Sequence, residues 1–209
     1  QFVDYDYPFQ QMNGVNILFP NFLTVIYPIR TERDAENYIA VLGQVKEGLE
    51  SAIIKSEEQV ANGVIPPRFI LEATINSMNI FINPEPSQNP LVTAFSDKLE
   101  AVDELDANRR MQLINEVIAI VGTDIYPVWQ EAIDTLFSQQ DIAANDAGLW
   151  RFEEGETLYA QRLQTFTTTN LSPEEIHEIG LREVARIEQE MDGLFRQLGY
   201  NEGAISERV

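Results

Sequence analysis

Glu174 and His177 are the two residues whose types and spacing could best form a chemical site. They lie three positions apart in a segment of strong helical character. This spacing places two side chains on one face of a helix, as in helical di-iron carboxylate sites. Such a site needs a second set of ligands, and His177 is the only histidine in the chain. Negative charge is already favourable at a helix N-terminus, which accounts for Glu174. The pattern therefore predicts a capping and packing role for this pair, and no metal site.

Three consecutive threonines, Thr167, Thr168 and Thr169, lie in a short linker just before that segment. A loop between helices is a common place for binding residues, and hydroxyl groups can both donate and accept hydrogen bonds. The alternative is that these hydroxyls cap their own backbone. Together with His177, they are the candidate binding residues of the chain.

The sequence offers no set of catalytic residues. It has no cysteine, one histidine and no G-x-S-x-G motif, so no nucleophile and base can be paired. It also lacks the glycine-rich motifs that hold phosphate groups. We therefore predict neither a catalytic residue nor a cofactor site within this chain.

The charge of the chain argues against two classes of partner. With 14 Lys and Arg against 34 Asp and Glu, the formal net charge is −20, which repels nucleic acid and anionic lipid headgroups. No apolar run approaches the roughly 18 residues needed to cross a bilayer, so no transmembrane segment is expected. The first residue, Gln1, suggests a chain that has been processed or cut from a longer one.

Apolar residues recur at helical spacing over most of the chain, and no convincing strand pattern occurs. We expect one all-α domain over residues 1–209, an irregular array of about six or seven helices. Residues 1–30 should form an extended, aromatic-rich segment and residues 31–209 the helical array. Pro127 should kink or break a helix near Tyr126. The expected helical segments are residues 31–62, 69–82, 91–102, 106–137, 153–166 and 172–198.

Residues 172–198 carry the strongest signals. Ser172, Pro173 and Glu175 form a capping box with proline at the first helical position. The apolar residues that follow recur every three or four positions, which predicts a helix packed along its length on partner helices. This seam consists of Val184, Ile187, Met191, Leu194 and Leu198.

Several motifs resemble one bacterial family, the domain of unknown function numbered 885, in its N-terminal half. The most specific is the stretch from Thr167 to Met191, reading TTTNLSPEEIHEIGLREVARIEQEM. The others are Pro20-Asn21-Phe22-Leu23, Tyr27-Pro28-Ile29, Ala35 with Tyr38-Ile39, Pro66-Pro67-Arg68-Phe69 and Asn89-Pro90-Leu91. Two positions depart from the family pattern: Leu158-Tyr159 stands where many relatives have a tandem tyrosine, and Phe166 where they have a histidine.

The resemblance implies a largely helical protein related in architecture to zinc metallopeptidases, exported into the periplasm or anchored by lipid to the envelope. In such relatives the metal-binding helix, a His-Glu followed by Pro-Gly-His-His, comes in the second half of the protein. Zinc is thus implied for the full-length protein and not for this chain. The implied partners are the missing C-terminal half and a peptide substrate.

Two functional hypotheses follow. In the first, the chain is the cleft-forming helical region of a zinc metallopeptidase-like hydrolase whose metal site lies beyond it. In the second, it is a non-catalytic helical binding module of the bacterial cell envelope. A complete module should bury its own apolar surfaces, and this expectation separates the two hypotheses.

Overall fold

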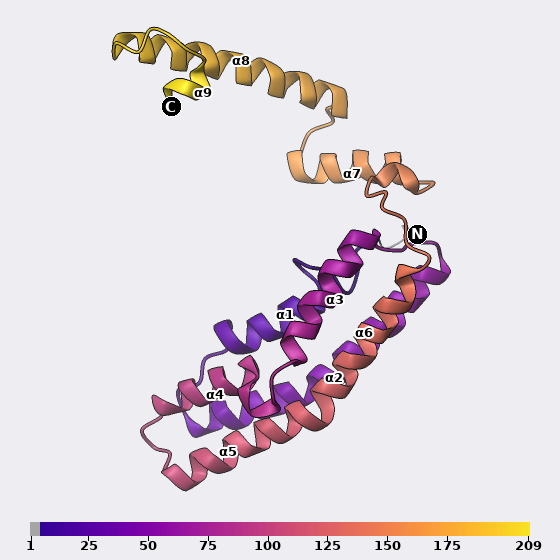
Figure 1. Cartoon of the computed structure of the whole chain (residues 1–209), viewed down its shortest axis with the longest axis vertical. Helices are drawn as coiled ribbons and strands as arrows, with labels where there is room; N and C mark the ends of the chain where they lie inside the picture. Colours follow the sequence, from indigo (N-terminus) through magenta and orange to yellow (C-terminus); the bar gives the residue numbers. More distant parts are fainter. Residues whose placement is uncertain (1–4) are drawn as a thin grey trace. The chain divides into compact units, whose positions relative to one another are not determined.

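The structure, a computed structural model, describes residues 5–209, and these residues form helices and loops without a strand (Figure 1). The prediction of an all-α protein is confirmed. The helices are α1 (Val15–Asn21), α2 (Glu32–Ala61), α3 (Arg68–Ile82), α4 (Pro90–Glu100), α5 (Ala107–Ile120), α6 (Tyr126–Gln140), α7 (Gly155–Thr167), α8 (Pro173–Gln197) and α9 (Ile205–Arg208). Two π-helical turns, η1 (Phe22–Ile26) and η3 (Val121–Ile125), and two 3-10 turns, η2 (Pro86–Gln88) and η4 (Leu149–Arg151), complete the described elements.

The chain divides into two compact units, Gln1–Ala147 and Gly148–Val209. The first contains α1 to α6 and most of the buried side chains, and the second contains α7 to α9. The expectation of one domain over residues 1–209 stays a prediction.

Helix α2 organises the first unit. Its start is a capping box in which the Thr31 side chain accepts a hydrogen bond from the Asp34 backbone N–H and the Asp34 carboxylate accepts one from Thr31 N–H. Helices α5 and α6 pack along α2, and α3 packs against α6 (Figure 1). The buried stripe of α2 contains all the apolar residues whose spacing predicts it, namely Ala35, Tyr38, Ile39, Leu42, Val45, Leu49, Ala52 and Ile53.

The capping box makes the stability of α2 depend on pH. Hydrogen bonds from Arg30 N–H and from Thr31 hold the pKa of Asp34 below its usual value of 3.8. A carboxyl with a depressed folded-state pKa stabilises the fold above its unfolded pKa, and this stabilisation is lost as the pH falls through the folded value. We expect Asp34→Asn to lower the urea midpoint at neutral pH, and this difference from the parent to shrink below pH 3.8. Glu57→Gln, at an exposed position of the same helix, is the control. An Asp34→Asn deficit that is the same in acid and at neutral pH would contradict this assignment.

Residues 15–26 are helical, which corrects the expected extended segment over residues 1–30. Helix α1 runs into η1 although Pro20 lies inside it. Tertiary contacts explain the difference: Leu23 is buried, and the Lys98 ammonium donates hydrogen bonds to the carbonyl oxygens of Leu23 (3.0 Å) and Tyr27 (2.8 Å). A cation thereby satisfies carbonyls that the end of a helical segment leaves free. Phe2, which belongs to the N-terminal aromatic group in the sequence, lies outside the described residues.

The aromatic ring of Phe19, in this N-terminal segment, packs against Gly48 of α2. A Cβ atom at Gly48 would lie 2.9 Å from the ring of Phe19, so only glycine allows the ring to approach so closely. Gly48 therefore costs helix propensity, but it lets α1 pack against α2.

The break predicted at Pro127 takes the form of a π-helical turn. Helix α5 ends at Ile120, η3 covers Val121–Ile125, and Pro127 lies in the first turn of α6, where its missing N–H costs little. Val121 and Ile125 are fully buried, so the turn remains part of the core.

Three residues of the family-like motifs have structural roles. The Tyr38 hydroxyl donates to the Leu91 carbonyl oxygen (3.0 Å), and burial raises the pKa of Tyr38. The Arg68 guanidinium donates to the carbonyl oxygen of Ala143, joining the start of α3 to the loop after α6. Asn89 is fully buried and joins α4, the end of α3 and Tyr126. These motif residues thus hold loops to helices.

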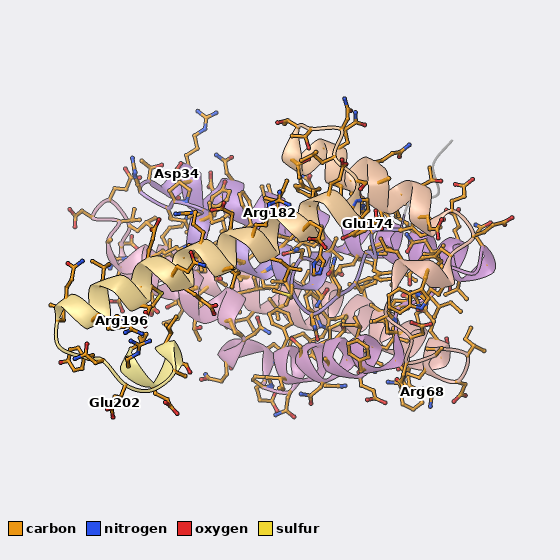
Figure 2. The ribbon with its side chains drawn as sticks, turned by 90° about the horizontal axis from the view of Figure 1, so that it is seen from above. Asp34, Arg68, Glu174, Arg182, Arg196 and Glu202 are labelled. Atoms are coloured by element: carbon orange, nitrogen blue, oxygen red, sulfur yellow. The ribbon has the colours of Figure 1, made fainter. Side chains whose placement is uncertain are left out.

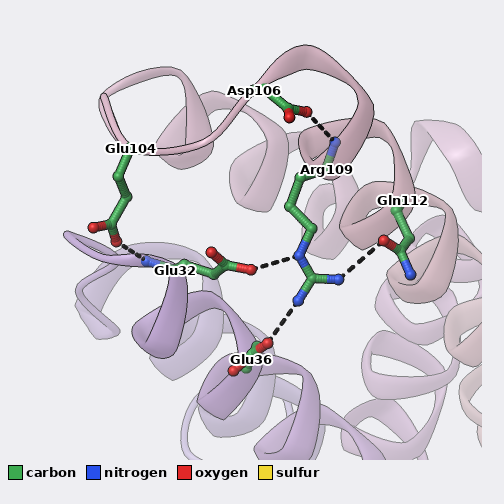
Figure 3. Close-up of polar contacts among 6 residues, drawn as sticks. All are labelled: Glu32, Glu36, Glu104, Asp106, Arg109 and Gln112. Carbon is green, nitrogen blue, oxygen red and sulfur yellow. Dashed lines mark hydrogen bonds and ion pairs between the residues drawn. The ribbon is translucent and has the colours of Figure 1, made fainter.

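A surface cluster joins the beginnings of α2 and α5 (Figure 3). Arg109 donates to Glu32 (2.5 Å), Glu36 (2.6 Å) and Gln112 (3.0 Å), while its own backbone N–H is capped by Asp106. Glu104 accepts a hydrogen bond from the backbone N–H of Glu32. Each carboxylate of this cluster accepts a hydrogen bond, so the cluster holds the beginnings of α2 and α5 together.

The second unit buries little of its own surface. Gly155 and Leu158 are the buried residues of 148–209, and Leu158 is still 9% exposed. From the sequence, Trp150 and Phe152 are predicted to return to the core after the polar loop of residues 139–149. Trp150 is instead 75% exposed, which corrects this prediction. Such a small core cannot stabilise a unit of this size alone.

Helix α8 begins where the sequence predicts, but it does not pack along its length on partner helices as predicted. Its capping box is present, with the Ser172 side chain accepting from Glu175 N–H and the Glu175 carboxylate accepting from Ser172 N–H. Four of the five residues of the seam predicted to pack on partner helices are instead exposed, Met191 is half-buried, and no residue of α8 is buried. Figure 2 shows side chains along α8 from Glu174 near its beginning to Arg196 near its end. The apolar period correctly predicts the helix, but it carries no information on whether a partner is present in the chain.

Candidate functional site

The threonine linker forms the end of α7. Thr167 donates a hydrogen bond from its hydroxyl to the Leu163 carbonyl oxygen, and its Oγ1 lies 2.9 Å from Oγ1 of Thr169. The Thr168 hydroxyl donates to the Thr167 carbonyl oxygen. Asn170 accepts from the Gln164 side chain across the same turn. All three hydroxyls therefore make local contacts, as the capping alternative expects, and their oxygens keep capacity to accept a ligand's hydrogen bond.

Thr168 is the C-cap of α7 and has a φ of +56°. The left-handed region is unfavourable for a β-branched residue, at a cost of about 1–3 kcal/mol. Strained positions of this kind are found disproportionately in binding and catalytic loops. This strain is the structural feature that supports a binding role for the linker.

His177 is exposed on the second turn of α8, close in sequence to the linker. Among the described residues, no group of three or more His, Cys, Asp or Glu side chains could hold a metal ion. Zinc needs two or three further ligands besides one histidine. One histidine therefore cannot by itself hold the zinc that the family resemblance implies for the full-length protein, and Glu174 with His177 supplies at most two ligands.

A cavity of about 400 Å³ lies in the second unit, between η4 and the start of α7. It is lined by Leu149, Trp150, Gly155, Glu156 and Tyr159. Gly155 makes this geometry possible, because a Cβ atom there would lie 1.9 Å from the Leu149 carbonyl oxygen. The lining is mostly apolar with a single carboxylate.

Sequence reasoning missed this cavity, since it places Trp150 in the core. The available signal was the pair Gly148 and Gly155 around an aromatic residue, which is typical of close backbone approach. Of the Leu158-Tyr159 pair, which stands where a tandem tyrosine was expected, Leu158 is buried and Tyr159 lies on the cavity wall. Phe166, the other departure from the family pattern, is 83% exposed.

A second cavity, of about 290 Å³, lies in the first unit between the N-terminal segment and α2. Its walls are Phe19, Phe22, Leu23, Val41, Gln44 and Val45. The N-terminal aromatic residues thus divide between two roles: Phe9 is buried in the core, while Phe19 and Phe22 form a groove.

Residues 5–209 form helices and loops without a strand, so the protein belongs to the all-α class. The profile of the family described as "Bacterial protein of unknown function (DUF885)" matches residues 2–209. The chain belongs to this family, DUF885.

One solved structure is similar over almost the whole chain. It is described as "the putative lipoprotein from Colwellia psychrerythraea", is 32% identical, covers 97% of this chain and superposes with a TM-score of 0.90. The present chain covers 34% of that protein, so it spans about a third of the relative's length. The search of curated proteins finds no match. Among the described residues, no helix is both long and apolar enough to cross a membrane.

Proposed function

We propose that this chain is the cleft-forming helical region of a larger, zinc metallopeptidase-like hydrolase. The metal site of that hydrolase would lie outside the 209 residues, and the protein would be exported or anchored to the cell envelope. The observation that carries the proposal is the unpartnered apolar face of α8 in a chain that spans 34% of its solved relative. A region built to work with a further part of the protein is expected to expose such a face.

The residues of this chain would shape and bind, and they would not activate water. The linker at Thr167, Thr168 and Thr169 offers hydroxyls at a strained turn, and His177 lies one helical turn beyond the start of α8. Hydroxyl groups in such positions suit the amide and carbonyl groups of a peptide. No cluster of three or more His, Cys, Asp or Glu side chains among the described residues could hold a metal ion, and the proposal assigns zinc chemistry to the remainder of the protein.

The second candidate is a non-catalytic binding module of the cell envelope. The apolar cavity formed by Trp150 and Tyr159 favours it, because a small ligand could bind there without any catalytic group. The exposed face of α8 weighs against it, since a self-sufficient module buries its amphipathic helices.

The test uses the longer polypeptide that contains this chain. We expect stoichiometric zinc by metal analysis and cleavage of fluorogenic peptides that a chelator abolishes. Thr168→Ala, which keeps a side chain at the strained position, should raise KM roughly tenfold with little change in kcat, because it removes ground-state binding. Thr165→Ala, an exposed threonine one turn earlier whose hydroxyl also donates within its helix, is the matched control.

Three results would count against the proposal. One is a longer gene product that lacks a His-Glu and His-His ligand helix after Val209. Another is hydrolysis by the purified 209-residue chain alone, for which we expect neither bound zinc nor activity. The third is a Thr168→Ala variant with the kinetics of the parent, which would remove the linker from the cleft.

A further inference from the structure

Helix α8 carries an apolar stripe that is exposed over most of its length, although Ile176 and Met191 are half-buried and α9 packs against α8. At about 100° per residue, seven positions fall within a narrow sector of the helix surface. Val184 is 55% exposed, Ile187 45%, Leu194 59% and Leu198 72%. We call this surface the α8 stripe; it consists of Ile176, Gly180, Val184, Ile187, Met191, Leu194 and Leu198.

Several charged residues beside the stripe form ion pairs with one another. Arg186 donates to Glu183 (2.9 Å) and Glu190 (2.7 Å) along one side. Along the other, Asp192 accepts from Arg196 and from Arg208 of α9, both at 2.6 Å. These pairs hold the long side chains at the edges, so the apolar sector between them is left open.

Gly180 lies in the middle of the first half of the stripe. A Cβ atom at this position would meet nothing within 4 Å. Glycine inside a helix is less favourable than alanine, and packing within this structure gives no reason for it. A glycine on an apolar helix face allows another backbone to approach closely, so Gly180 points to a partner helix that packs against this turn.

We propose that the α8 stripe is the docking surface for the remainder of the polypeptide, an apolar helix of which packs across Gly180 and along Val184, Ile187 and Leu194. This inference shares one premise with the proposed function, namely that the chain is part of a longer polypeptide. A chain of the solved relative's length has roughly two thirds of its residues outside the matched part, which is ample to supply this helix.

Charge disfavours the other occupants. A second copy would bring a further formal charge of −20 and place the glutamates flanking the two stripes opposite one another. An anionic membrane surface is repelled by the same charge. A covalently attached helix has a high effective concentration and need not overcome the entropy of association.

The absence of cysteine makes the test direct, because single cysteines can be introduced without background from this region. Val184→Cys and Ile187→Cys lie on the stripe, and Ala185→Cys and Gln189→Cys lie on the exposed opposite side of the same helix. Each is placed in the longer polypeptide, with any cysteine elsewhere replaced, and labelled with a maleimide in buffer and in urea. We expect labelling in buffer to be at least roughly tenfold slower at the stripe positions than at their neighbours, and equal in urea.

The same four variants in the 209-residue chain complete the design. There the stripe positions should label as fast as Ala185→Cys. Slow labelling of the stripe cysteines in the 209-residue chain would mean that the first unit or a second copy covers the stripe. Either outcome would overturn the proposal, and a doubling of the mass with concentration would identify the second copy. Equal labelling of all four positions in the longer polypeptide would do the same.

Gly180→Ala gives an independent readout with opposite expected signs. In the 209-residue chain it should increase helix content, because alanine favours the helix and its Cβ meets no atom. In the longer polypeptide it should lower the Tm, because the Cβ would push the docked helix away. A rise in both would contradict close packing at Gly180. Peptide hydrolysis is measured separately, so a protected stripe without activity would end the proposed function and leave the docking surface in place.

Discussion

Replacement of Trp129 by alanine is expected to lower the free energy of unfolding by about 3–5 kcal/mol. Trp129 is 1% exposed, and its ring stacks on Phe81 with the ring centroids 4.3 Å apart. It thereby joins α6 to α3, a major helix pair of the first unit. The large loss follows because the buried ring leaves a cavity that the surrounding helices can fill only in part. Urea unfolding followed by circular dichroism measures it.

The chain supplies its own control, since it contains two tryptophans. Trp150 is 75% exposed, so Trp150→Ala should change stability by no more than about 0.5 kcal/mol. Trp129→Phe is a second comparison. The indole Nε1 of Trp129 is buried without an acceptor among the described residues, so phenylalanine removes an unpaired donor together with part of the ring. It should cost less than alanine. Equal losses for Trp129→Ala and Trp150→Ala would mean that the core is not centred on α3 and α6.

Asn89→Ala is expected to cost about 3 kcal/mol, although the change is small in volume. The Asn89 side chain caps α4 by accepting from Leu91 N–H (2.9 Å). Its amide nitrogen donates to the Phe81 carbonyl oxygen (2.9 Å) and to the Tyr126 hydroxyl (3.3 Å), which itself donates to the Pro84 carbonyl oxygen. Alanine would remove the partner of Leu91 N–H and of the Phe81 carbonyl oxygen, and a polar group left without a hydrogen bond costs more than the bond contributes.

A double-mutant cycle with Tyr126→Phe separates the network from the cap. The phenol of Tyr126 touches both Asn89 and Pro84, so the losses for the two single variants should sum to more than the loss for the double variant. Asn201→Ala, at an exposed position, should be close to neutral. Simple additivity of Asn89→Ala and Tyr126→Phe would show that the two side chains act independently, against the network seen here.

The local signals in the sequence were sufficient for most helix boundaries. Four helices begin with a side chain that accepts a hydrogen bond from a backbone N–H no more than three residues away. These capping residues are Thr31, Asn89, Asp106 and Ser172. Such caps depend on side chains adjacent in the chain, so a reader of the sequence sees both partners. The all-α class follows from the same local patterns.

The sequence was less informative about the candidate site. The threonine linker and His177 could be proposed from residue type and position, but neither the positive φ of Thr168 nor the contact between Thr167 and Thr169 could be read from them. The cavity at Trp150 was missed because an aromatic residue after a polar loop is equally compatible with the core and with a cavity wall.

By itself the sequence determined the helical periodicity, most helix starts and the acidic charge, all of which depend on composition and on neighbours within a few residues. Three features were decided only by the tertiary structure. Residues 15–26 are helical and are held by hydrogen bonds from Lys98, the ring of Phe19 packs against Gly48, and most of the α8 stripe is exposed to solvent. The physical reason is that amphipathicity states which face a helix would bury, whereas burial itself requires a second surface, supplied from distant parts of the chain or from beyond it.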